Sequence, residues 1–192
     1  DLSQDGNDGT INGATYDSNN YFDFDGSNDK ITLPSTDICN WGSGSYSYVF
    51  WVQFGSTSGS YRAVFSNYKS GSGNKGMIIG LKNGEISSHL PDSQGSVDTG
   101  VAPDLNTWMQ MVVTKDGTNH KVYLNGSVIG SITNASATLN NMPQLPELGH
   151  IPVSSQDGWL NGKIAIVMVY NAALSETQVT QNFNASKARF GL

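Results

Sequence analysis

Apolar and polar residues alternate along residues 109–124, near the middle of the chain. Three apolar side chains of the first run fall on one face by a period of two: Met109, Met111 and Val113. Asp116-Gly117 ends this run and Asn125-Gly126 ends the next. Both dipeptides are strong signals for tight hairpin turns, because glycine adopts positive φ at no steric cost. The pattern predicts a three-stranded antiparallel meander over residues 108–132, with one face in the core.

The same period of two predicts strands on either side of this meander. Residues 21–33 alternate as a hairpin, residues 46–54 are apolar on both faces, and residues 159–170 form a long late strand. A strand with two apolar faces must be covered on both sides, so we expect residues 46–54 to be central in a sheet. Ten alternating apolar positions are expected in the core: Phe22, Phe24, Phe50, Val52, Met111, Val113, Val122, Leu124, Val167 and Val169.

The late strand also carries apolar side chains on both faces. By strict alternation its outward side chains are Ile164, Ile166, Met168 and Tyr170. Left in water they would form a patch prone to association, so something must cover them. Two kinds of cover are possible. One is the loops and the closing helix of this chain, and the other is a protein partner or a second copy. The helix is expected over residues 176–188, because Ser175 fits an N-cap and Gln178 completes a capping box.

Length and composition fit one all-β domain over residues 1–192. The chain has 22 glycines and only 14% charged residues. Its formal charge of −6 and scattered Lys and Arg disfavour nucleic acid as a partner, because phosphate binding needs clustered cations. No apolar run is long enough for a membrane span. The lone Cys39 is expected to be a small buried side chain, and a start at Asp1 without a visible signal peptide suggests a mature product or an excised module.

Three segments together resemble a known family. Residues 108–126 read Trp-x-x-Met-Val-Val-Thr-Lys-Asp-Gly-x-x-x-x-Val-Tyr-Leu-Asn-Gly, residues 22–31 read Phe-Asp-Phe-Asp-Gly-Ser-Asn-Asp-Lys-Ile, and residues 162–176 contain Gly-Lys-Ile-Ala-Ile-Val-Met-Val-Tyr. In this order they resemble the laminin-G-like modules of the concanavalin A-like lectin/glucanase superfamily. The resemblance implies a two-sheet antiparallel jelly-roll β-sandwich with a short C-terminal helix. Function stays open, since this fold carries lectins, hydrolases, lyases and structural modules.

Catalytic patterns of the superfamily are missing from the sequence. Retaining glucanases use two carboxyl groups about 5 Å apart. None of the three glutamates, Glu85, Glu147 and Glu176, has an acidic neighbour two or four residues away. Lyases combine His, Tyr and Arg. Histidines are available here, but Arg62 and Arg189 sit in no recognisable motif. We therefore expect that the protein is not an enzyme.

The resemblance also implies a calcium ion between rim loops, held by oxygen ligands as this hard cation prefers. The candidates are short acidic or amide side chains in turns, Asp25, Asn28, Asp29 and Asp157, together with Asp92 and Asp98 in the long loop. The alternative is that these residues only form turns by bonding their own backbone.

Sugar binding needs aromatic faces that stack on a pyranose and polar groups for its hydroxyls. Candidates near predicted strand ends or on outward faces are Tyr61, Tyr68, Tyr123, His150 and Trp159. We expect a non-catalytic carbohydrate-binding module for recognition or adhesion, in a larger extracellular, cell-surface or virion protein. The alternative is a structural module of a virion, filament or surface protein that binds no glycan.

Overall fold

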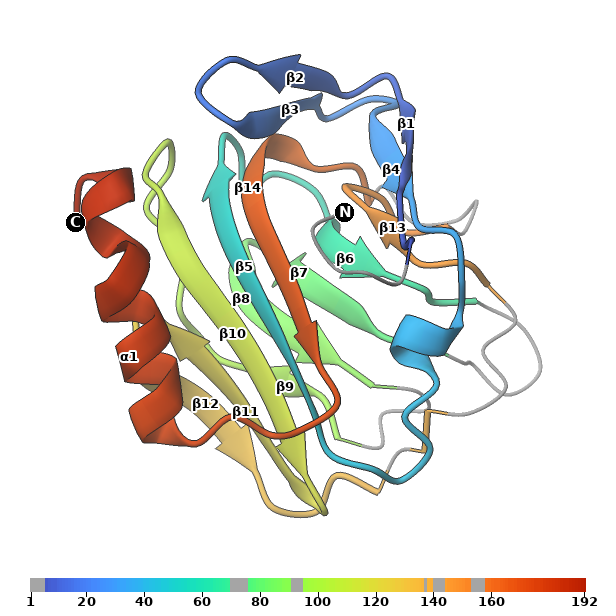
Figure 1. Ribbon diagram of the computed structural model, residues 1–192, viewed down its shortest axis with the longest axis vertical. Helices are drawn as coiled ribbons and strands as arrows, with labels where there is room; N and C mark the ends of the chain where they lie inside the picture. Colours follow the sequence, from blue (N-terminus) through green and yellow to red (C-terminus); the bar gives the residue numbers. More distant parts are fainter. Residues whose placement is uncertain (1–5, 70–75, 91–94, 137, 140–143, 153–157) are drawn as a thin grey trace.

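The protein folds as two seven-stranded antiparallel sheets packed face to face (Figure 1). The structure is a computed structural model that describes residues 6–69, 76–90, 95–136, 138–139, 144–152 and 158–192. Sheet A has the order β1 (Thr10–Asn12), β4 (Lys30–Thr32), β13 (Glu147–Leu148), β6 (Tyr61–Ser66), β7 (Ile78–Lys82), β8 (Glu85–His89) and β9 (Val97–Asp98). Sheet B has the order β12 (Ser127–Ile132), β11 (Asn119–Leu124), β10 (Met109–Asp116), β5 (Tyr46–Phe54), β14 (Asn161–Tyr170), β3 (Tyr21–Asp25) and β2 (Thr15–Asp17). The expected jelly-roll sandwich is confirmed.

The predicted meander is present as β10, β11 and β12. Strand β10 pairs with β11 in register, with Val113 opposite Val122. Asn125 and Gly126 both adopt positive φ, 49° and 84°, as the turn into β12 requires. All ten predicted core residues lie in the apolar cluster between the sheets or pack against it. Cys39 is also fully buried there, and burial raises the pKa of its thiol to about 12.

Strand β5 is buried on both faces, as its sequence predicts. Tyr48, Phe50 and Val52 enter the core between the sheets, whereas Val49 belongs to a second cluster on the outer side of sheet B. That second cluster includes Val179 of helix α1 (Glu176–Ser186). The outer face of β5 is therefore covered by this chain itself.

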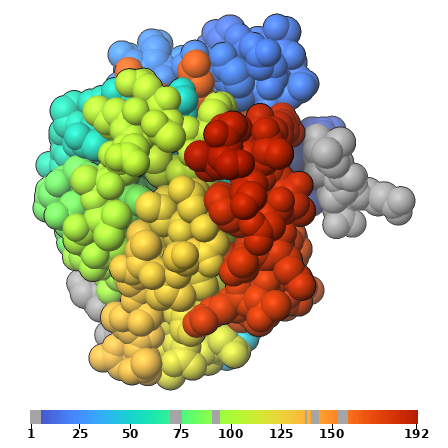
Figure 2. All heavy atoms as spheres, turned by 90° about the vertical axis from the view of Figure 1, so that its left-hand side faces the viewer, coloured from blue at the N-terminus to red at the C-terminus, as the bar shows by residue number. Residues whose placement is uncertain are grey.

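Helix α1 begins at the predicted N-cap. Ser175 Oγ accepts a hydrogen bond from the Gln178 backbone amide, and the Ser175 backbone N–H donates one to Gln178 Oε1. Figure 1 shows α1 alongside β10, and Figure 2 shows the red helix packed against the yellow strands β11 and β12. Trp51 holds the C-terminal end of α1. Its indole N–H donates to Ser186 Oγ at 3.0 Å, and its ring stacks on the Phe190 ring with centroids 4.0 Å apart. No helix among the described residues is long and apolar enough to cross a membrane.

One predicted side-chain direction in the late strand is wrong. A register shift between Ile164 and Ile166 in β14 breaks the alternation, so Ile164 enters the core with 3% exposure. The other three side chains keep the predicted outward direction and are half-buried: Ile166, Met168 and Tyr170. Met168 and Tyr170 pack against the cluster that α1 covers. This chain therefore covers part of the face through the cluster that contains Val179 of α1, and a partner over the rest of it stays a prediction.

A buried histidine joins the two sheets. His120 of β11 is fully buried, and its Nδ1 donates to the Gly95 carbonyl at 2.6 Å. Because a carbonyl only accepts, Nε2 is left as the acceptor for the Ser88 hydroxyl of β8, at 3.1 Å. Burial lowers the pKa of His120 from 6.5 to about 4. The ring is therefore a neutral structural bridge, with no access to solvent.

Replacing Trp51 tests how α1 is held. Trp51→Ala removes a fully buried indole and its hydrogen bond to Ser186, so we expect the free energy of unfolding to fall by about 3–5 kcal/mol in urea titrations. Tyr16→Ala on the edge strand β2 is the control, because Tyr16 is 57% exposed and its loss should change stability by less than about 1 kcal/mol. Equal effects of the two substitutions would contradict this packing.

The His120 bridge predicts a pH dependence of stability. Between pH 6.5 and about 4 the unfolded chain binds a proton at His120 and the folded chain does not. The free energy of unfolding should therefore fall by roughly 3 kcal/mol over this window as pH decreases. In His120→Asn this contribution is absent, so the stability difference between the two proteins should shrink toward pH 4. Parallel pH profiles from urea titrations would refute the assignment.

Candidate functional site

The outer faces of the two sheets differ in what covers them. Helix α1 lies over sheet B, whereas none of the described helices lies over the outer face of sheet A. In sheet A, the paired residues Leu81 of β7 and Ile86 of β8 enter the core. The residues before and after them along each strand therefore point outward. We call this outer surface of β13, β6, β7, β8 and β9 the open face.

Four of the five predicted sugar-binding residues gather on the open face. Tyr61 and Tyr68 pack against a small apolar cluster of Ala63, Ile78 and Ile151. His150 directly precedes Ile151, and its ring stacks 3.6 Å from Trp159 at an interplanar angle of 22°. The two tyrosines, His150 and Trp159 are all partly exposed. Ile151 of this cluster is the residue after His150, so segments about 90 residues apart in sequence bring aromatic rings to the same part of the open face.

A buried carboxylate orients His150. Glu147 is only 4% exposed, and it accepts hydrogen bonds from His150 Nδ1 at 2.6 Å and Lys30 Nζ at 2.8 Å. Burial acts to raise the pKa of Glu147, but the hydrogen bonds from His150 and Lys30 outweigh it and hold the pKa below 4.5. Glu147 is therefore ionised at neutral pH and fixes the plane on which Trp159 stacks.

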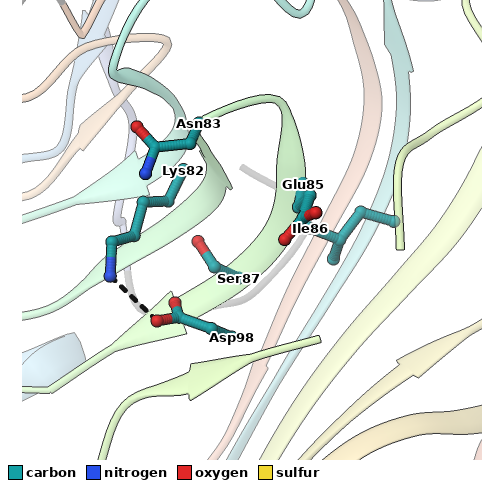
Figure 3. Close-up of a pocket in the computed structure, with 6 residues that line it drawn as sticks. All are labelled: Lys82, Asn83, Glu85, Ile86, Ser87 and Asp98. Atoms are coloured by element: carbon teal, nitrogen blue, oxygen red, sulfur yellow. Dashed lines mark hydrogen bonds and ion pairs between the residues drawn. The ribbon is translucent and has the colours of Figure 1, made fainter. Parts of the chain in front are cut away.

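A polar pocket lies at the other end of the open face (Figure 3). Its volume is about 100 Å³, and it is lined by Lys82, Asn83, Glu85, Ile86, Ser87 and Asp98. Asp98 accepts from Lys82 Nζ at 2.8 Å and from His89 Nε2 at 3.0 Å. Tyr61 meets His89 edge-on, with ring centroids 5.8 Å apart. The pocket and the aromatic cluster are therefore continuous.

The ionisation of this pocket follows from its contacts. Burial acts to raise the pKa of Asp98, but the hydrogen bond from Lys82 and the nearby His89 outweigh it, so the pKa lies below 3.8. Burial and the Lys82 ammonium group lower the pKa of His89 below 6.5, against the opposing effect of Asp98. Asp98 is therefore ionised at neutral pH, where it accepts from Lys82 Nζ.

Comparison with protein families supports the fold. The family model described as the concanavalin A-like lectin/glucanases superfamily matches residues 25–180 of this chain. The chain belongs to this superfamily. A comparison with curated proteins finds no match.

Solved structures with the superfamily's fold include binding domains of botulinum neurotoxins. The serotype G binding domain is 17% identical with a TM-score of 0.71, over 96% of this chain and 48% of that chain. The neurotoxin DC binding domain, solved in complex with SialylT, is 17% identical with a TM-score of 0.67, over 95% and 48%. The neurotoxin DC binding domain in complex with rat synaptotagmin II is 17% identical with a TM-score of 0.67, over 94% of this chain and 48% of that chain. At these identities the likeness shows the fold, and this chain spans about half the length of those chains.

One predicted sugar-binding residue is misplaced. Tyr123 points to the outer side of sheet B as its alternation indicates, but the cluster containing Val179 of α1 buries it to 1% exposure. A ring buried to this degree offers no face to a sugar. The error arises because alternation gives the direction of a side chain and not what later segments place over it.

The predicted calcium residues of the first hairpin form hydrogen bonds within their own turn. Asp25 accepts hydrogen bonds from the backbone amides of Ser27 and Asn28, and Asp29 accepts one from the Asp25 amide. Within the described ranges, no group of three or more His, Cys, Asp or Glu side chains is placed to hold a metal ion. Asp98 accepts hydrogen bonds from Lys82 and His89. Asp92 and Asp157 lie outside the described residues, so calcium binding stays a prediction.

The pocket residues were missed in the search for sugar-binding residues. Glu85, Ser87 and His89 share one face of β8 by a period of two, directly after the Asn83-Gly84 turn. This alternation of polar side chains was the available signal. Their meeting with Asp98 needs the pairing of β8 with β9, which the sequence alone does not give.

Glu147→Gln tests the Lys30–Glu147–His150 contacts. Lys30 and His150 use different oxygens of Glu147, and glutamine replaces one of these with an NH2 group that cannot accept. We therefore expect the free energy of unfolding at pH 7 to fall by about 1–3 kcal/mol. The difference should be present above pH 4.5 and disappear as pH falls through the lowered pKa of Glu147. Glu176→Gln is the control, because its ion pair with Lys121 is exposed and contributes less than about 1 kcal/mol. Equal losses in both variants would refute the role of Glu147.

Proposed function

We propose that this protein is a non-catalytic carbohydrate-binding module that holds a glycan across the open face of sheet A. The observation that carries the proposal is that Tyr61 and Tyr68 pack against the apolar cluster that contains Ile151, the residue next to the His150–Trp159 stack. Rigid aromatic side chains supply an apolar surface with a polar edge, which suits the mixed faces of a sugar ring. The adjoining pocket supplies hydrogen-bond donors and acceptors for hydroxyl groups.

Rigidity supports this assignment. Trp159 is stacked on His150, and His150 is oriented by the buried Glu147. Side chains already fixed in the free protein lose little conformational entropy on binding, which favours affinity for a flexible ligand such as a glycan. The toxin domains that share the fold are named as binding domains, one of them solved with SialylT. By analogy we assign this chain to a secreted or surface protein.

The absence of catalysis is also part of the proposal. Glu85 lies in β8, Glu147 in β13 and Glu176 in α1, and Glu176 is on the opposite side of the sandwich from the other two. Glu147 is held by Lys30 and His150, which leaves it in a structural role. The structural alternative depends on an uncovered face of β14, and two of its outward side chains, Met168 and Tyr170, already pack against the cluster that contains Val179 of α1. Glycan recognition is therefore the reading that we develop.

Glycan-array binding with surface variants tests the proposal. Tyr61→Ala and Trp159→Ala should each weaken binding of any glycan that the wild type binds by at least tenfold, which corresponds to about 1.4 kcal/mol. Tyr16→Ala, exposed on β2, is the matched aromatic control and should bind as the wild type does. Thermal melts of each variant separate lost contacts from lost folding.

Two results would contradict the proposal. One is a wild type that binds no glycan on a broad array. The other is a glycan whose binding is unaffected by both open-face substitutions. Release of reducing sugar from polysaccharides that bind would instead refute the non-catalytic part.

A further inference from the structure

The pocket contains a buried hydroxyl group without a partner. Ser87 is only 2% exposed, and its Oγ makes no hydrogen bond within the described structure. Buried hydroxyl groups are normally hydrogen-bonded, so such an atom in a surface pocket indicates a group that arrives from outside. Figure 3 shows Ser87 between the side chains of Lys82 and Asp98, with its hydroxyl turned towards Lys82.

The ion pair of Lys82 and Asp98 closes the pocket over Ser87. Lys82 belongs to β7 and Asp98 to β9, and β8 lies between these strands. The 2.8 Å contact between Lys82 Nζ and Asp98 therefore spans β8, where Ser87 is the direct neighbour of Asp98. Their side chains are 29% and 52% exposed, and an ion pair in such contact with water is easily exchanged for other polar partners.

The size of the pocket limits what can enter it. The volume of the pocket is about 100 Å³. Pockets that enclose a whole small molecule are typically about three to ten times larger. One hydroxyl or hydroxymethyl group fits, while the ring that carries it remains outside, towards Tyr61 and the rest of the open face.

The charges of the pocket favour a neutral group over an anion. Asp98 offsets Lys82, and Glu85 adds a further carboxylate to the lining. The chain as a whole has a formal charge of −6. A carboxylate brought into this pocket would meet like charges, which is a common means of rejecting a wrong ligand.

We propose that the pocket binds a hydroxyl-bearing arm of an uncharged sugar through Ser87, Lys82 and Asp98, and thereby selects neutral over acidic glycans. This inference rests on the proposed function of the open face and names its ligand class. An incoming hydroxyl displaces the Lys82 ammonium group from above Ser87. It then donates to Asp98 or accepts from Lys82, while Ser87 Oγ gains the partner that it lacks.

The experiment uses hexose oligosaccharides in matched pairs, each as the neutral form and as the uronic acid form in which the C6 hydroxymethyl group is a carboxylate. The wild type should bind the neutral member at least tenfold more tightly. Ser87→Val fills the pocket and should weaken the affinity for the neutral oligosaccharide at least tenfold. Ser87→Ala, which adds no bulk, should weaken it several-fold. Ser131→Val on the exposed edge strand β12 is the matched control and should bind as the wild type does.

The charge of the pocket is tested separately. Glu85→Lys should shift the ratio of neutral to acidic binding at least fivefold towards the acidic form. Equal binding of both members by the wild type, or neutral binding that survives both Ser87 substitutions, overturns the inference. If those glycans still require Tyr61 and Trp159, the open face remains the binding site and only the pocket assignment fails. If the wild type binds no member of any pair, the proposed function and this inference fail together.

Discussion

Strand β5 is apolar on both faces, and the rest of the architecture follows from the need to cover it twice. Tyr48, Phe50 and Val52 require sheet A on one side, and Val49 and Trp51 require a second layer on the other. The chain supplies this second layer with α1, whose end is held by the stacking of Phe190 on Trp51. Fully burying each large apolar side chain contributes about 1.5–3 kcal/mol, so both layers are needed for stability.

This arrangement separates a structural side from a recognition side. The outer face of sheet B packs against α1, and this packing buries the aromatic residue Tyr123. None of the described helices packs on the outer face of sheet A, so its partly exposed tyrosines and the His150–Trp159 stack can contact a ligand. The buried contacts of Glu147 give this surface its rigidity.

Sequence reasoning was most successful where the signal is local. The meander, the Ser175 capping box and the central position of β5 each depend on residues a few positions apart, and all three are confirmed. It failed at Ile164, because the register shift in β14 arises from its pairing with β5. For Tyr123 the direction was right and the exposure wrong, since the covering residue Val179 comes more than 50 positions later. The pocket was missed for the same reason, because Lys82 and Asp98 meet only across β8.

The central claim is that ligand binds on the open face of sheet A, and mapping of amide chemical shifts by NMR during titration with a bound oligosaccharide tests it most directly. The account predicts that the largest shifts fall on β6, β7, β8 and β9 and at His150 and Trp159, while β12 and α1 remain unperturbed. Shifts concentrated on α1 and the outer face of sheet B would contradict it.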